Sequence, residues 1–169
     1  MRPDTLRIAA LLLDYPDREL YAMTPQLTAA AERIPERHGR GELLELLAHR
    51  ARIGEHAAQE EYVATFDFHK RASLHLSYFR DGDRRQRGAT LLGLKRRYRE
   101  AGFELKGGEL PDYLPAILEF AALVPGDASR EILGRMRPGI ELLRASLHDL
   151  ASPYARVLDA VVSVLPSLT

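Results

Sequence analysis

Positive charge gathers in one stretch of the sequence, where it could take part in binding chemistry. Residues 70–99 contain ten lysines and arginines against two aspartates, a net charge of +8, while the rest of the chain carries −8. Such a stretch could attract a phosphate-bearing ligand or a charged peptide, or it could form a solvated helix face that pairs with acids elsewhere. Its cations are Lys70, Arg71, Arg80, Arg84, Arg85, Arg87, Lys95, Arg96, Arg97 and Arg99.

Metal-binding and nucleophilic sites are not predicted. The chain has no cysteine, which excludes disulfides, thiolate nucleophiles and iron–sulfur clusters held by this chain. Its six histidines include no pair at the i, i+4 spacing of a helical zinc site. His69 and His75, with Asp67, Asp81 and Asp83 nearby, could be imagined as metal ligands, but a surface or core histidine is the commoner explanation. No serine lies in a nucleophile elbow. From these absences together we expect a protein that holds no metal or cofactor and is not an enzyme.

One pair of carboxylates could act together as acids. Asp112 and Glu119 stand seven residues apart in a segment with helical spacing, which places them on one helix face, about 10 Å apart along the axis. In the alternative, which we favour, Asp112 is the N-cap of that helix and Glu119 pairs with an arginine.

The elements that must position these residues are predicted to be helices throughout, because apolar residues recur at intervals of three and four. Proline and glycine mark the breaks, with loops expected at 35–41 and 104–109. We predict one all-α domain over residues 1–169, a helical bundle of about seven to nine helices. The first expected helix begins after the N-cap Asp4 and ends before Pro16, and the second, 17–34, has a kink or break at Pro25. Another helix is capped by Asp127 or Ser129, and Pro138 could interrupt it. The remaining expected helices are 42–53, 55–66, 84–101, 111–124 and 152–165.

Composition sets broad limits on function. Apolar residues make up 46% and charged residues 28% of the 169-residue chain, as in an ordinary globular protein. The formal net charge of zero gives no reason to expect a nucleic-acid partner. The early apolar run at 8–13 is too short for a signal peptide, and Glu119 interrupts the longest apolar segment. We therefore expect a cytoplasmic protein that does not insert into a membrane.

Several sequence blocks resemble one known family. They fall in the family's order and spacing, and the block at 109–115 is specific rather than generic. The blocks are YVATFD at 62–67, SLHL at 73–76, GDRRQRG at 82–88, ELPDYLP at 109–115 and LEF at 118–120, with LLLDYP at 11–16 and SPY at 152–154 in support. With these blocks the chain resembles the NarJ family, the nitrate reductase molybdenum cofactor assembly chaperones, also called the delta subunit.

The resemblance implies both a fold and a role. The fold would be similar to that of the TorD and DmsD chaperones. The protein would bind the N-terminal segment of the apo nitrate reductase catalytic subunit, together with its iron–sulfur subunit. It would assist molybdenum cofactor insertion and complex assembly before membrane attachment. The alternative is a small-molecule binder that holds the molybdenum cofactor or a nucleotide phosphate at the basic stretch 70–99.

Candidate peptide-binding residues can be named on the predicted helices and beside them. A helical domain can offer an apolar groove to an amphipathic peptide, while charges at the rim fix its register. The alternative, which we favour for any single one of the groove residues, is that it belongs to the core. The expected groove residues are Tyr62, Phe66, Tyr113, Leu114, Tyr154 and Leu158, and the expected rim or bracing residues are Asp67, Arg84, Arg87, Asp112 and Glu119.

Overall fold

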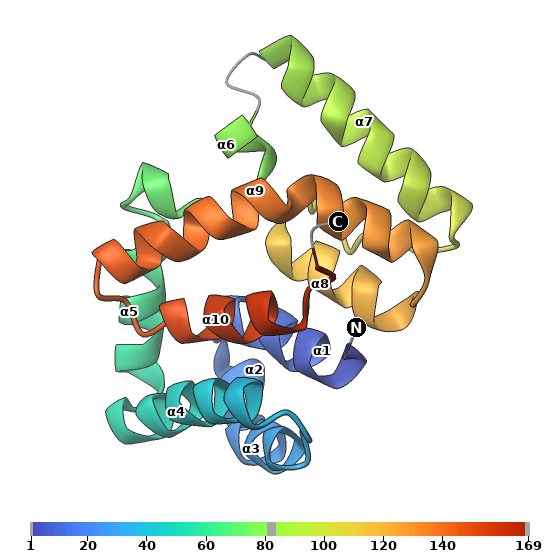
Figure 1. The fold of residues 1–169 in the computed structure, drawn as a ribbon. Coiled ribbons are helices and arrows are strands. Elements are labelled where there is room, and N and C mark those ends of the chain that lie inside the picture. The colour runs from blue at the N-terminus through green and yellow to red at the C-terminus, as the bar shows by residue number, and fades with distance from the viewer. Residues whose placement is uncertain (1, 81–83, 168–169) are drawn as a thin grey trace.

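The computed structural model describes residues 2–80 and 84–167, and within these ranges the regular elements are helices and no strand is present (Figure 1). The all-α helical bundle is therefore confirmed. The elements are α1 (Pro3–Leu12), α2 (Arg18–Ala22), α3 (Thr24–Glu32), α4 (Arg37–Ile53), α5 (Glu55–Phe66), a 3-10 turn (Lys70–Ala72), α6 (Ser77–Arg80), α7 (Arg84–Glu100), α8 (Leu114–Leu123), α9 (Asp127–Asp149) and α10 (Ala155–Val164).

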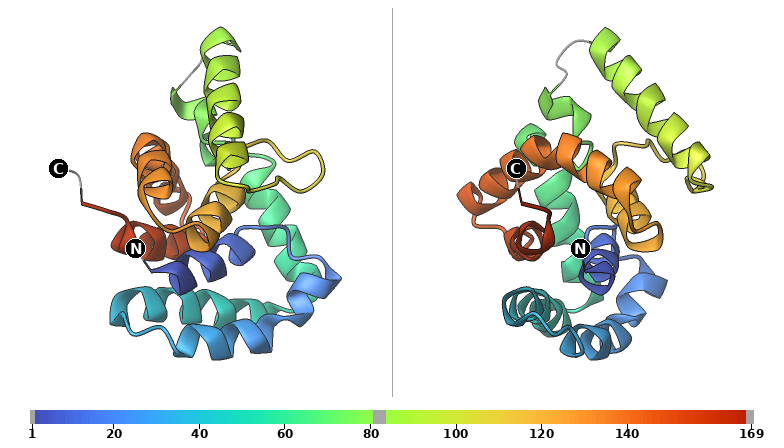
Figure 2. Two further views of the ribbon diagram at one scale, coloured as in Figure 1. Left: turned by 90° about the vertical axis from the view of Figure 1, so that its right-hand side faces the viewer. Right: turned by 45° about the vertical axis from the view of Figure 1, so that its right-hand side comes forward.

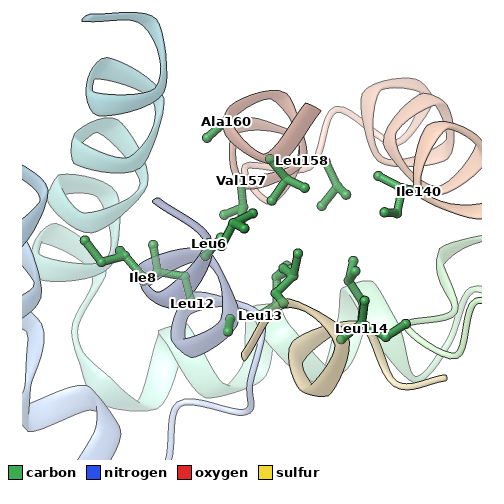
Figure 3. Close-up of a cluster of buried hydrophobic side chains, with 14 of the residues drawn as sticks. Leu6, Ile8, Leu12, Leu13, Leu114, Ile140, Val157, Leu158 and Ala160 are labelled. Carbon is green, nitrogen blue, oxygen red and sulfur yellow. The ribbon is translucent and has the colours of Figure 1, made fainter. Parts of the chain in front are cut away.

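Helix α1 lies at the centre of the core. It is apolar on most of its circumference, and Leu6, Leu12 and the following Leu13 are fully buried. A helix of this kind must be covered on several sides, and α1 packs against α8 and α10 as well as α3 and α4. Figure 3 shows Leu6 pointing toward Val157 of α10. The core therefore joins the two ends of the chain.

Several helix ends agree with their sequence signals. The expected break at Pro25 is present, because α2 ends at Ala22 and α3 begins at Thr24. Helix α7 ends just before Gly102, whose φ of 76° favours glycine. Among the described residues, no helix combines the length and the apolar character needed to cross a membrane.

Other helix ends differ from the expectation. Residues 37–41 belong to α4 rather than to a loop, because Gly39 is buried, with Ser163 and Thr5 3.6 Å and 3.8 Å from where its Cβ would stand, and this burial outweighs the low helix propensity of glycine. Asp4 and Asp127 lie inside their helices and cap neither of them; Ser129, the other residue expected to cap α9, is also inside it. Pro138 does not interrupt α9.

The continuity of α9 has a structural reason. A proline inside a helix costs about 3 kcal/mol, but α9 buries a long apolar face that includes Leu133, Ile140 and Leu147. The missing side chain of Gly139 also lets α9 lie directly on the backbone of Leu76, since an added Cβ would stand 3.2 Å from the Leu76 oxygen. Burial and close packing together hold the helix through the proline.

Helix α7 stands at the outer edge of the molecule, where its first turns extend away from the bundle (Figures 1 and 2). Among its described side chains, Leu94 and Tyr98 are buried, and both lie in its C-terminal half. The rest of the helix is largely polar, as the charge of its sequence requires.

Candidate functional site

Two pockets meet at one dividing wall. The first, of about 590 Å³, is lined by Tyr62, Phe66, Phe68 and Tyr78 among others, and we call it the aromatic pocket. The second, of about 570 Å³, is lined by Asp14, Asp17, Glu109, Tyr15 and Leu110 among others, and we call it the acidic pocket. His75 and Tyr113 line both pockets, so these two residues form the dividing wall.

Large apolar side chains are exposed around both pockets. In the aromatic pocket, Phe68 is 76% and Tyr78 50% exposed, and in the acidic pocket Tyr15 is 44% and Leu110 37% exposed. Apolar surface that gathers around hollows in this way is typical of a binding site rather than of ordinary protein surface.

Two non-helical segments build the dividing wall. The Leu76 amide donates a hydrogen bond to the Asp112 carbonyl at 3.1 Å, and the Leu114 amide donates one to the Leu74 carbonyl at 2.8 Å. These bonds form an isolated antiparallel bridge that sets His75 beside Tyr113, with ring centroids 5.2 Å apart. The wall therefore depends on two segments that are far apart in the sequence.

Asp112 is a buried brace for this wall. Its side chain is fully buried, and its Oδ2 accepts hydrogen bonds from the Ser77 amide at 3.2 Å and from the Ser77 hydroxyl at 2.5 Å. Arg87 of α7 donates from Nε to the Ser77 hydroxyl at 3.1 Å and places Nη2 3.8 Å from Asp112 Oδ2. The carboxylate thus joins α6, α7 and the segment before α8.

The predicted cap at Asp112 is wrong. Residues 110–113 form a turn in which the Tyr113 amide donates to the Leu110 carbonyl at 3.1 Å, and Tyr113, extended in the bridge, is the N-cap of α8 and makes no side-chain cap bond. Asp112 therefore lies before the helix and does not share a helix face with Glu119. Glu119 is within 3.9 Å of Lys106 rather than pairing with an arginine.

Hydrogen bonds and ring contacts join the aromatic pocket to the core. The Tyr113 hydroxyl donates to Asp14 Oδ1 at 2.9 Å, and the Tyr62 hydroxyl donates to the Leu13 carbonyl at 2.8 Å. The Tyr62 ring lies 4.8 Å from that of Phe66. Burial raises the pKa of Tyr62 and of Tyr113, so both hydroxyls stay protonated and available as donors.

The carboxylates around the acidic pocket repel one another. Burial raises the pKa of Asp14, and the nearby carboxylates of Glu119 and Asp17 add to the rise, although the Tyr113 hydrogen bond and Lys106 work against it. Burial, Asp14 and Glu119 likewise raise the pKa of Glu109. A cationic group entering this pocket would relieve the repulsion between these acids.

Comparisons with known proteins point to one family. A family model described as "Nitrate reductase delta subunit" matches residues 31–160. The chain belongs to this family. It is 36% identical over 167 residues to the probable nitrate reductase molybdenum cofactor assembly chaperone NarJ of Bacillus subtilis (strain 168), covering 99% of this chain and 91% of that protein.

Further relatives agree with the family. The nitrate reductase molybdenum cofactor assembly chaperone NarJ of Escherichia coli (strain K12) is 32% identical, with 94% of this chain and 68% of that protein covered. The nitrate reductase-like protein NarX of Mycobacterium tuberculosis (strain ATCC 25618 / H37Rv) is 36% identical, but the match covers only 23% of its length. The delta subunit family is one of assembly chaperones rather than of catalytic enzymes, as the sequence predicts.

The predicted binding residues of this delta subunit family member fall into three groups. Tyr62, Phe66, Asp67 and Tyr113 line the aromatic pocket together. Arg87 and Asp112 brace the dividing wall, while Glu119 influences the acidic pocket through its charge. Leu114, Tyr154 and Leu158 are fully buried in the core (Figure 3 shows Leu114 and Leu158), and the side chain of Arg84 lies outside the described residues.

One residue behind the site was not predicted. Arg50 is only 2% exposed, and its guanidinium lies 5.5 Å from the centre of the Tyr154 ring. Its Nη2 donates to the Leu12 carbonyl at 2.8 Å and to the Tyr154 hydroxyl at 2.9 Å. The regular spacing of α4 gives no signal for such a role, because a cation on a helix is usually exposed.

The basic stretch does not converge on one pocket in the part of the chain that the structure describes. Arg71, Arg87 and Arg97 take part in ion pairs with Asp149, Asp112 and Glu131. Lys95 and Arg99 line a separate pocket of about 440 Å³. The same described ranges contain no group of three or more histidines and acids that could hold a metal.

Proposed function

We propose that this protein is a nitrate reductase assembly chaperone that assists molybdenum cofactor insertion. It binds the N-terminal segment of the apo catalytic subunit across the aromatic and acidic pockets. In this role it holds the catalytic subunit together with its iron–sulfur subunit before the complex attaches to the membrane. The proposal follows the names that the relatives carry and the resemblance of the sequence blocks.

The observation that carries the binding site is the pair of pockets with their exposed apolar rims. An amphipathic segment binds a groove through a few apolar anchors spaced along one face, and each pocket can accept such anchors. Phe68 and Tyr78 would cover one anchor, and Tyr15 and Leu110 the next. Because Asp14, Asp17 and Glu109 line the acidic pocket, we expect the bound segment to place cationic groups there.

A calorimetric titration tests the site with a synthetic peptide of the first ~15–40 residues of the catalytic subunit, a helix-in-groove ligand. Phe68→Ser should weaken binding by about 10-fold or more, because burying a phenylalanine contributes about 1.5–3 kcal/mol and 1.4 kcal/mol is tenfold. Leu142→Ser is the matched control, since Leu142 is also exposed (51%) but lies on α9 and lines neither pocket. No heat with the unmodified protein at high micromolar concentration would count against the function, and equal affinities of the two variants would count against the site.

The charge of the acidic pocket is tested by Asp17→Asn. Asp17 also caps α2 by accepting a hydrogen bond from the Leu20 amide at 2.8 Å, and asparagine caps about as well as aspartate. The variant should therefore fold normally, bind the peptide more slowly and lose part of the salt dependence of association. Stopped-flow association rates at two salt concentrations measure this effect, and an unchanged salt dependence would mean that this charge does not face the peptide.

A further inference from the structure

Helix α7 holds the dividing wall at two points. Near its start, Arg87 contacts the Ser77 hydroxyl and the Asp112 carboxylate. Further along, the buried Tyr98 donates a hydrogen bond from its hydroxyl to the Pro111 carbonyl at 2.7 Å. These two residues of α7 stand about 16 Å apart along the helix axis, yet they hold adjacent residues of the wall segment. The helix therefore supports the segment that carries Tyr113 through contacts with two of its neighbouring residues.

The wall needs such support because it has little of its own. Its two segments are not helical around His75 and Tyr113, and the bridge between them consists of two backbone hydrogen bonds. The fully buried Asp112 carboxylate leaves its Oδ1 without a hydrogen-bond partner, so the guanidinium of Arg87 supplies much of the compensation that a buried charge requires. Loss of Arg87 would leave this charge poorly compensated and the wall free to shift.

The position of α7 against the bundle, which we call its seating, is thereby linked to the shape of the two pockets. The first half of α7 extends from the bundle (Figure 2), and Arg87 is its contact with the buried carboxylate of the wall. When α7 moves, Pro111 and Asp112 must move or lose their partners, and Leu110 and Tyr113 beside them line the pockets. A ligand that needs the wall in place would in turn favour the seated helix, because coupling between two sites is reciprocal.

We propose that Arg87 and Tyr98 are positioning residues that couple the seating of α7 to the binding groove. The role of the groove as a peptide site rests on the proposed function, but the support of the wall by α7 does not. Occupancy of the groove stabilises the seated helix, and displacement of the helix opens the wall and releases the ligand.

Three variants test the coupling. Arg87→Gln removes the charge at the wall, and Tyr98→Phe removes one hydroxyl while keeping a ring that packs against Phe120 at 4.8 Å. Arg97→Gln is the control, because it removes a charge from α7 without touching the wall, and the pair with Glu131 of α9 that it breaks is solvent-exposed and contributes little to holding α7 in place. Each variant is examined by peptide titration and by amide hydrogen exchange of the full-length protein without ligand.

Amide exchange reports the wall directly. The Leu76 and Leu114 amides donate the two bridge hydrogen bonds, so their exchange should become about 10-fold faster in Arg87→Gln and about 3-fold faster in Tyr98→Phe. Peptide affinity should fall by similar factors, mainly through faster dissociation. In Arg97→Gln both quantities should stay within about 2-fold of the unmodified protein. Adding Asp112→Asn to Arg87→Gln should recover much of the lost protection, since the buried charge that needed Arg87 is gone.

The outcomes separate the two proposals. If exchange at Leu76 and Leu114 is no faster in Arg87→Gln and Tyr98→Phe than in the Arg97→Gln control, the positioning role is wrong. If exchange accelerates as expected but the unmodified protein binds no peptide, the proposed function fails and the support of the wall stands. If exchange accelerates and peptide affinity does not change, the coupling to the groove is overturned. Tyr98→Phe, the mildest change, keeps the test valid should Arg87→Gln fold poorly.

Discussion

Replacing Asp112 by alanine is expected to destabilise the protein by about 3–5 kcal/mol, because two buried hydrogen-bond donors lose their charged acceptor. Asp112 is fully buried, and Ser77, which donates two hydrogen bonds to its Oδ2, is 1% exposed. The substitution leaves both Ser77 donors without their acceptor, at about 1–3 kcal/mol each. The loss of its partner costs Arg87 little, because the Arg87 side chain is 33% exposed and water can solvate its charge once Asp112 is gone.

The asparagine variant distinguishes this role from that of a helix cap. Asparagine keeps an oxygen for Ser77 and loses only the charge, so Asp112→Asn should cost about 1–2 kcal/mol, close to one charged hydrogen bond. A helix cap would behave differently, with a loss of about 0.5–2 kcal/mol for alanine and almost none for asparagine.

Urea unfolding followed by far-UV circular dichroism measures these differences, since the chain has no tryptophan to serve as a fluorescent probe. For a chain of this size, the alanine variant should melt about 6–20 °C lower than the unmodified protein. A loss below about 1 kcal/mol for Asp112→Ala would refute the reasoning, because even one buried donor left without its acceptor costs about 1–3 kcal/mol.

Three further predictions concern the buried Arg50 and the acids of the acidic pocket. Arg50→Met should lower the free energy of unfolding by about 2–4 kcal/mol in a urea titration, because the Leu12 carbonyl and the Tyr154 hydroxyl lose a buried donor. Burial raises the pKa of Asp14 and of Glu109 in the folded state. At pH values between the ordinary and the raised pKa of each group, the folded protein therefore binds more protons than the unfolded chain. These two groups should make the free energy of unfolding rise as the pH falls from neutral through the raised pKa values. Asp14→Asn keeps an acceptor for Tyr113 and should remove part of that rise, as seen in urea titrations at several pH values.

Each of these results has a clear opposite. An Arg50→Met protein as stable as the unmodified one would mean that its two acceptors find water. His75 acts against the two acids, because burial and Arg87 lower its pKa, so its contribution to stability is lost as pH falls through its ordinary value. Comparing Asp14→Asn with the unmodified protein cancels the contribution of His75. An identical pH dependence in the two proteins would show that Asp14 is not the source of the rise.

The helices could be predicted because their apolar spacing is a local signal, whereas several of their ends could not. Residues 37–41 read as a loop from Gly39 and Gly41, but Gly39 is buried, and a Cβ added to it would stand 3.6 Å from the Ser163 hydroxyl of the last helix, a neighbour that no local pattern reports. Pro138 read as a break, yet the burial of α9 on both sides of it outweighs the local cost. In both places packing between distant segments decided the structure.

The site was predicted in part for a similar reason. Tyr62, Phe66, Asp67 and Tyr113 could be named because they lie in the sequence blocks of the family resemblance, and all four line one pocket. Phe68, Tyr78, Tyr15 and Leu110 lie at helix ends or in non-helical segments, where apolar spacing does not separate core from surface. The two pockets that they surround share His75 and Tyr113, which a long-range bridge with no local signature brings together.

Asp112 shows how a local rule and a tertiary contact compete for one side chain. As a cap it would accept one hydrogen bond at the surface, where water offers nearly the same, so the net gain is about 1 kcal/mol. In the fold its buried carboxylate accepts two hydrogen bonds from the buried Ser77, which is 35 residues away, and it lies 3.8 Å from the guanidinium of Arg87. Hydrogen bonds to a charge are stronger where water is excluded. The tertiary contact therefore prevails, and α8 begins without a side-chain cap so that the wall between the two pockets can be braced.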